Sequence, residues 1–251
     1  MPDLILLTGL DFATLVYLLI VTLLAAIVRG YSGFGFSALV VLTATWVLPP
    51  VKVVPIILLL EIIASLQLLP SIWSHIQWAR LIRLLIGSAF SIPFGIYYLV
   101  NLDENLTRLT ISILVLIASL LLLRGRSFAR YDGPSLDLSM GLISGAITGA
   151  SAVGGLAVVV VFLSVQLEVV AIRSTLVALF FATDVYASLL GMTFGLIDEK
   201  LLFTTALMIP PLVLGVVVGN RLFKKTSAVS FRKFTLLLLI LLSLAGMIRF
   251  L

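Results

Sequence analysis

The stretch that decides the fold is IVRGYSGFGFSALVV, which runs from Ile27 to Val41. A second stretch, AITGASAVGGLAVVV from Ala146 to Val160, aligns with it without a gap at an offset of 119 positions. The offset superposes glycines and serines of the two copies: Gly30 with Gly149, Ser32 with Ser151, and Gly35 with Gly154. Self-similarity at a fixed spacing indicates that the chain is a duplicated half.

Five apolar stretches make up each half, and the glycine motif joins the first two. In the first half they are Phe12–Val28, Phe34–Leu48, Val51–Trp73, Leu81–Val100 and Leu106–Leu123. In the second half they are Leu138–Thr148, Val153–Leu167, Leu176–Ile197, Leu201–Val218 and Phe234–Ile248. We therefore predict one transmembrane domain over 1–251, with a first repeat at 12–123, a cytoplasmic connector at 124–137 and a second repeat at 138–251.

Composition places the chain in the membrane. Hydrophobic residues make up 62% and charged residues 11%, whereas about a quarter of the residues in soluble domains are charged. The sequence thus predicts an all-α polytopic membrane protein in contact with the lipid bilayer. Because there is no cysteine and the only histidine is His75, we expect no metal site and no cofactor.

Charged residues between the stretches predict the topology, since short basic loops stay on the cytoplasmic side. Three basic segments are the turn at 75–83, the connector and the turn at 221–233, while Asp103–Glu104 and Asp198–Glu199 mark the opposite face. The turn after the third stretch is therefore inside in one half and outside in the other. Inverted-topology repeats of this kind are typical of transporters. Both termini are predicted outside, and because topology explains the net charge of +5, we expect no nucleic-acid partner.

The first two stretches of each half look like broken helices, about 11 to 17 residues long, against roughly 20 needed to cross. They either cross fully or form a hairpin, and an odd number of crossings per half inverts the second copy in both cases. Glycine permits the break and lets a ligand approach backbone N–H groups, and the following helix presents its positive end. Two inverted copies would direct two such ends to one point near the bilayer midplane, which suits a small anion.

The predicted anion site combines the residues of both breaks. The candidates are Arg29, Gly30, Ser32, Gly33, Gly35, Gly149, Ser151, Gly154 and Gly155. Arg29 could clamp an oxyanion with its guanidinium fork, or it could be an arginine that reaches from a helix end to the membrane surface. The glycines could instead serve helix packing, as the spacing of Gly141, Gly145 and Gly149 suggests.

Each half has one acidic residue near the middle of its third stretch, Glu61 in the first and Asp184 in the second. The two positions are one helical turn out of strict register. A charge at the centre of a membrane helix needs a partner or a task. We expect these carboxylates either to carry a coupling proton or to ion-pair with Arg29. Static charge compensation is the simpler alternative.

At these residues the sequence resembles the sulfite exporter TauE/SafE family, also called the toluene sulfonate uptake permease family. The resemblance covers the whole chain and rests on RGYSGFGF at Arg29–Phe36, GASAVGG at Gly149–Gly155, the basic connector, and FRK at Phe231–Lys233. It implies a carrier of sulfite, sulfonate or sulfoacetate-type anions in a prokaryotic cytoplasmic membrane. It leaves open the anion, the direction and the coupling ion.

Two other functions compete with an alternating-access transporter of a small anion. A passive anion channel would have the same fold. An intramembrane serine protease would use Ser151 in its GxSx setting, but His75 is predicted in a distant turn. We therefore predict a transporter and not an enzyme, and a homodimer is left open.

Overall fold

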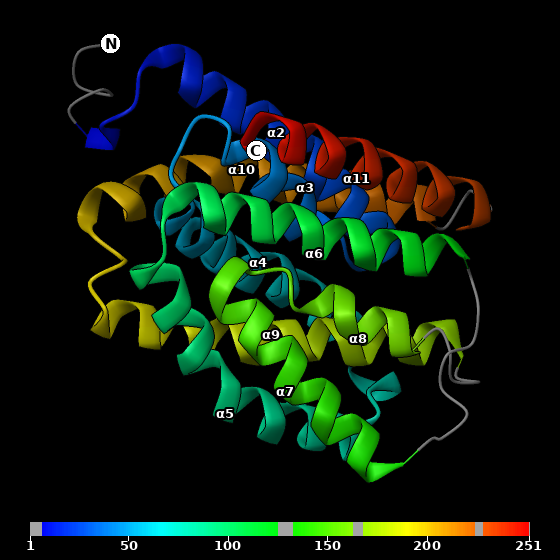
Figure 1. Cartoon of the computed structure of the whole chain (residues 1–251). Coiled ribbons are helices and arrows are strands. Elements are labelled where there is room, and N and C mark those ends of the chain that lie inside the picture. The colour runs from blue at the N-terminus through cyan, green and yellow to red at the C-terminus, as the bar shows by residue number, and fades with distance from the viewer. Residues whose placement is uncertain (1–6, 125–132, 163–167, 224–227, 251) are drawn as a thin grey trace.

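The computed structural model describes residues 7–124, 133–162, 168–223 and 228–250. The helices of the first repeat are α2 (Phe12–Ser32), α3 (Phe36–Ala44), α4 (Pro50–Ile72), α5 (Trp78–Asn101) and α6 (Glu104–Arg124), with a short 3-10 turn at Trp73–His75. The helices of the second are α7 (Pro134–Ser151), α8 (Gly155–Phe162), α9 (Val169–Thr193), α10 (Glu199–Phe223) and α11 (Ala228–Phe250). All regular structure in these ranges is helical (Figure 1).

Six of the described helices are long and apolar enough to cross a membrane, namely α2, α4, α5, α6, α9 and α10. The outer surface agrees, because large apolar side chains such as Phe90 and Phe94 on α5 are exposed. In water such a surface would be a liability, whereas in a bilayer it contacts lipid. The predicted all-α polytopic membrane fold is confirmed.

Helix boundaries repeat at the same offset as the glycine motif. The ends of α2 and α7, at Ser32 and Ser151, are 119 positions apart, and so are the first residues of α3 and α8. The starts of α4 and α9, at Pro50 and Val169, follow the same spacing. The duplicated sequence therefore specifies the same order of helix ends twice.

The fourth helix of each repeat packs against the first helix of the other repeat. α5 packs along α7 and α10 packs along α2, while α4 crosses α9 and α6 lies beside α11. Glycines make the first two contacts close: a Cβ atom on Gly149 would lie 2.4 Å from the carbonyl oxygen of Ile92, and one on Gly30 would lie 2.3 Å from that of Val216. The two repeats are thus interlocked by backbone contact, as small residues allow in membranes.

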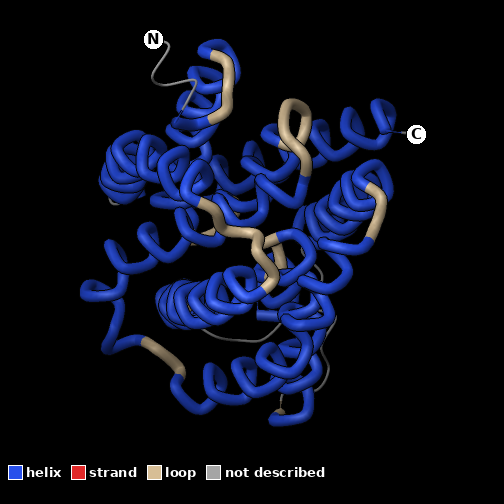
Figure 2. The backbone as a smooth tube through the Cα atoms, turned by 90° about the vertical axis from the view of Figure 1, so that its left-hand side faces the viewer, coloured by secondary structure: helices blue, strands red, loops and turns tan. Residues whose placement is uncertain are grey.

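The two repeats run in opposite directions. In Figure 1, α6 runs from left to right and α11 from right to left, and the start of α2 lies on the left. The acidic turns between α5 and α6 and between α9 and α10 also lie on the left, the end that Figure 2 views. Which end faces the cytoplasm stays a prediction. Four of the basic residues on which that prediction depends lie outside the described ranges: Arg126, Arg130, Lys224 and Lys225.

The glycine breaks turn the chain back on itself. The hydroxyl of Tyr17, near the start of α2, donates to the carbonyl of Thr43, near the end of α3. In the second repeat, Met140 of α7 and Val160 of α8 line one apolar cavity. α3 has 9 residues, about 14 Å at 1.5 Å per residue, which is too short to cross. Each pair is therefore a hairpin.

The expectation that both members of each pair are short is wrong for α2 and α7. α2 has 21 residues and α7 has 18. The apolar stretches underestimate them because a helix continues through polar residues as long as its backbone hydrogen bonds continue. Consequently Arg29 belongs to the last turn of α2, and Asp137, counted within the connector, lies in the first turn of α7.

Candidate functional site between the two glycine breaks

The first break depends on two glycines with left-handed backbone. Gly33 has φ +79° and Gly35 has φ +93°, which favour glycine strongly. The hydroxyl of Ser32 bonds across the break, donating toward the carbonyl of Phe34 over 2.6 Å. The chain thereby reverses within three residues, and α3 starts with its positive end inside the molecule.

The second break interrupts the helices at the equivalent position, but it has one left-handed residue where the first break has two. Ala152 stands at the position of Gly33 and has φ +59°, the only non-glycine residue with positive φ in the described chain. Gly155 starts α8, and a Cβ atom there would lie 1.8 Å from the ring of Phe180 on α9. The second break is therefore fitted against an aromatic ring.

Arg29 is fully buried at the end of α2, with 0% of its surface exposed. Its Nη2 lies 2.9 Å from Glu61 Oε2 on α4 as an ion pair and donates to Ser65 Oγ at 3.0 Å. Its Nη1 donates to the carbonyl of Gly33, and its guanidinium carbon lies 4.6 Å from the centre of the Phe180 ring. Arg29 therefore lies inside the protein and does not reach for the membrane surface.

Glu61 links three helices at this point. Its Oε1 accepts a hydrogen bond from Ser37 of α3 at 2.6 Å, and its Oε2 faces Arg29 of α2. The contact with Arg29 has the distance of an ion pair without the geometry of a hydrogen bond, and Oε2 accepts none from the described residues. The alternative of an ion pair between Glu61 and Arg29 is what the structure shows.

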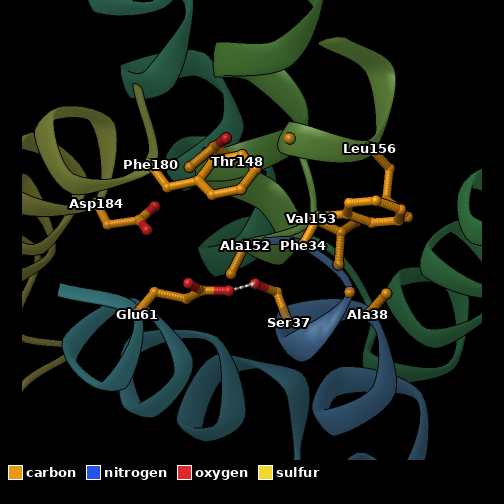
Figure 3. A pocket seen from close by; sticks show the side chains of 12 residues that line it. Phe34, Ser37, Ala38, Glu61, Thr148, Ala152, Val153, Leu156, Phe180 and Asp184 are labelled. Atoms are coloured by element: carbon orange, nitrogen blue, oxygen red, sulfur yellow. Dashed lines mark hydrogen bonds between the residues drawn. The ribbon is translucent and has the colours of Figure 1, made fainter. Parts of the chain in front are cut away.

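A small cavity lies beside this pair, between the two repeats (Figure 3). The carboxylates of Glu61 and Asp184 project toward it from α4 and α9, with Thr148 and Phe180 on one side. It has about 20 Å³ of space for water, roughly one molecule. Asp184 is 4% exposed and makes no hydrogen bond or ion pair to a described residue.

The predicted site residues divide between this cavity and its supports. Gly35 and Gly155 line it, whereas Arg29 lies behind Glu61 and Phe180. The hydroxyl of Ser151 donates to the carbonyl of Ile147 in its own helix, and that of Ser32 lies within hydrogen-bond distance of two carbonyls, those of Val28 and Phe34. The remaining glycines make close contacts elsewhere: Gly30 with α10, Gly149 with α5, Gly33 with Arg173, and Gly154 with the carbonyl of Ser144. Packing accounts for these four, so their role in binding stays a prediction.

Several residues at the cavity or bonded to Arg29 were missed by sequence reasoning. They are Ser37, Ser65, Thr148, Ala152 and Phe180. The 119-residue offset could have found them, because it superposes Thr148 on Arg29, Phe180 on Glu61 and Asp184 on Ser65. The two acidic residues are therefore not equivalent in the two repeats, although their helices are.

A second arginine supports the first break from α9. Arg173 Nη2 donates to the carbonyl of Gly30 at 2.9 Å and lies 3.3 Å from Asn220 Oδ1 on α10. Its aliphatic stem fills the place where a Cβ atom on Gly33 would be, 2.7 Å from Arg173 Cγ. Arg173 thus joins α2, α9 and α10.

The chain was compared with known proteins. The sequence profile described as sulfite exporter TauE/SafE matches residues 18–246. A "Probable sulfite/organosulfonate exporter TauE" of Cupriavidus necator is 24% identical over 196 residues, which are 76% of this chain and 77% of that protein. No solved structure matches. Because the profile covers both breaks and almost every described helix, the chain belongs to the sulfite exporter TauE/SafE family.

Proposed function

We propose that the protein carries a sulfur oxyanion of the sulfite, sulfonate or sulfoacetate type across a prokaryotic cytoplasmic membrane by alternating access. Membership of the family supports the class of substrate. The observation that carries the proposal is Arg29, a fully buried guanidinium at a helix break where the two repeats meet. An arginine inside a membrane protein is costly and by default marks a functional site.

The chemistry of the breaks suits an oxyanion. A guanidinium presents paired N–H donors in a fork that matches two oxygens of a sulfonate or sulfite. α3 and α8 begin beside the cavity, at Phe36 and Gly155. Each helix start favours an anion by about 0.3–1 kcal/mol when exposed and by up to about 2 kcal/mol when partly buried.

The small size of the cavity supports a carrier over a permanently open channel. With room for about one water molecule, it has no space for a sulfonate, so the hairpins must separate before an anion reaches Arg29. A carrier passes through such a closed state in every cycle, whereas a conducting channel keeps its path open. The glycine breaks supply the points at which each hairpin can tilt.

The test compares Arg29 with another arginine that pairs with a buried carboxylate. In the purified chain, methanesulfonate, sulfite and sulfoacetate should raise thermal stability by mass action, while chloride and acetate should not. Arg29→Lys keeps the charge but loses the fork, and we expect about 10- to 100-fold weaker binding, since a charge-assisted hydrogen bond contributes about 1.5–3 kcal/mol.

Arg83→Lys is the matched control. Arg83 pairs with Asp137 at 2.7 Å between α5 and α7, away from the cavity, so the same substitution there should leave anion affinity as it is. Flux of the same anions into proteoliposomes is the second measurement. Arg29→Gln protein that folds and still transports at the wild-type rate would overturn the assignment of the site.

A further inference from the structure

We propose that Glu61 couples the anion to a proton, so that one proton and one monovalent anion cross together without net charge. In this mechanism, which rests on the proposed function, the anion replaces the Glu61 carboxylate on Arg29. Glu61 takes up a proton as it leaves and releases it when the anion departs on the other side. The arrangement around Arg29 carries this inference.

Both terminal nitrogens of Arg29 already have partners in this state. Nη1 donates to the carbonyl of Gly33, while Nη2 contacts both Glu61 and Ser65. Only Nε is without a hydrogen-bond partner among the described residues. An anion that uses the fork through Nε and Nη2 must therefore displace Glu61, which is held to Arg29 by charge and not by a hydrogen bond to Oε2.

A displaced Glu61 would be a carboxylate without a counter-ion. Glu61 is buried in the middle of α4, and an unpaired buried charge costs several kcal/mol. Protonation removes that charge, and the adjacent cavity has room for the water that delivers the proton. Ser37, which already bonds to Oε1, can hold the neutral acid as it held the carboxylate, because a hydroxyl donates to either form.

Asp184 completes the charge balance. It is buried and faces the same cavity, and no ion pair joins it to a described cation. The mechanism keeps Asp184 as the neutral acid in both states, because a buried charge without an ion-pair partner is costly. Arg173 does not compensate it, because the two are 11 residues apart on α9, about 16 Å along the helix. Arg173 stays bonded to Gly30 and Asn220 and contributes the same charge to both states.

The count then gives a definite stoichiometry. In the empty site Arg29 and Glu61 cancel, and Asp184 is neutral. In the loaded site Arg29 and the anion cancel, and both carboxyl groups are neutral. The site therefore gains one anion and one proton, and the step across the membrane carries no net charge in either direction. A carrier without this exchange would move one negative charge per anion.

The experiment uses the full chain in proteoliposomes and methanesulfonate, whose charge stays at −1 throughout the pH range. We expect a pH gradient alone to drive accumulation, with one proton counted per anion by a trapped pH dye. A potassium diffusion potential alone should drive none. Wild-type accumulation that follows the potential without proton movement would overturn the coupling but leave the carrier intact, whereas no saturable flux at all would instead contradict the proposed function.

Glu61→Gln gives the sharpest contrast. The glutamine cannot take a proton, so the empty site keeps the charge of Arg29 and the loaded site is neutral. Accumulation should lose its dependence on pH and become voltage-driven, about tenfold for each roughly 60 mV. Asp184→Asn, which mimics the neutral acid next to the same cavity, should still move one proton per anion. If Asp184→Asn and not Glu61→Gln lost the proton, the coupling residue would be Asp184 and the proposal would be wrong.

Discussion

The two glycine breaks lie at equivalent positions of the repeats but differ in their chemistry. The first holds Arg29, Glu61 and Ser37 in a charged network, whereas the offset places Thr148, Phe180 and Leu156 at the same three positions of the second. Duplication thus preserved the hairpins and the helix starts, while the pair of arginine and carboxylate is present only once. Under the proposed function one guanidinium is enough for one anion, and a second buried pair would add desolvation cost.

A residue next to the second break covers the charged network of the first. Phe180, at the position of Glu61, covers the guanidinium of Arg29 and also fills the space above Gly155. One repeat therefore supplies the pair of Arg29 and Glu61, and the other supplies the aromatic cover over Arg29. A cation over an aromatic face gains about 2 kcal/mol or more when both are out of water, so the cover also stabilises the empty closed state.

The largest difference between the breaks should appear in the charge itself. Arg29→Leu leaves Glu61 buried without its partner and should lower the free energy of unfolding by about 3–5 kcal/mol. Thr148→Val at the equivalent position replaces a hydroxyl by a methyl group of similar size and should lower the free energy of unfolding by at most about 1–2 kcal/mol. Unfolding in detergent with increasing denaturant measures both. The double variant Arg29→Leu/Glu61→Leu should recover most of the loss, and equal losses for the two single variants would refute the contrast.

A middle-sized effect should follow from crowding at the second break. Gly155→Ala places a methyl group against the Phe180 ring, 1.8 Å away without movement, and should cost about 1–3 kcal/mol. Phe180→Leu should relieve part of that cost in the double variant, measured as the coupling energy of the cycle. Phe36 stands at the same position of the first repeat and is fully buried there, so the site of tightest packing differs between the repeats. Additive effects would mean that the ring is not the obstacle.

Sequence reasoning reached the repeated scaffold because the glycine motif carries the offset that also sets the starts of α4 and α9. It also gave an ion pair of Arg29 with Glu61 or Asp184 as one of two alternatives, since a membrane charge needs a partner or a task, and the structure has the pair with Glu61. It could not show that Glu61 lies between Arg29 and the cavity, or that the Phe180 ring lies over Arg29. These contacts join residues about 30 to 150 positions apart. Its prediction that Ser32 and Ser151 donate to an anion stays a prediction. In this structure both hydroxyls bond to nearby backbone carbonyls, as serines near helix ends commonly do.

The smallest effect should come from the backbone of the breaks. Ala152 holds the left-handed conformation that Gly33 holds in the first repeat, and a side chain there costs about 1–2 kcal/mol. Ala152→Gly removes this strain but adds unfolded-state freedom of about 0.5–1 kcal/mol, so it should stabilise the protein by less than about 1 kcal/mol.

Gly33→Ala should have the opposite sign, because it adds the same strain and crowds the stem of Arg173 at 2.7 Å. A small upward shift in melting temperature for Ala152→Gly and a clear downward one for Gly33→Ala would show that both breaks need the same turn and that only the first is relaxed in it. A loss of stability in Ala152→Gly would show instead that the buried methyl group of Ala152 packs more favourably than its backbone is strained. The second hairpin would then be fixed by its side chains and the first by its glycines.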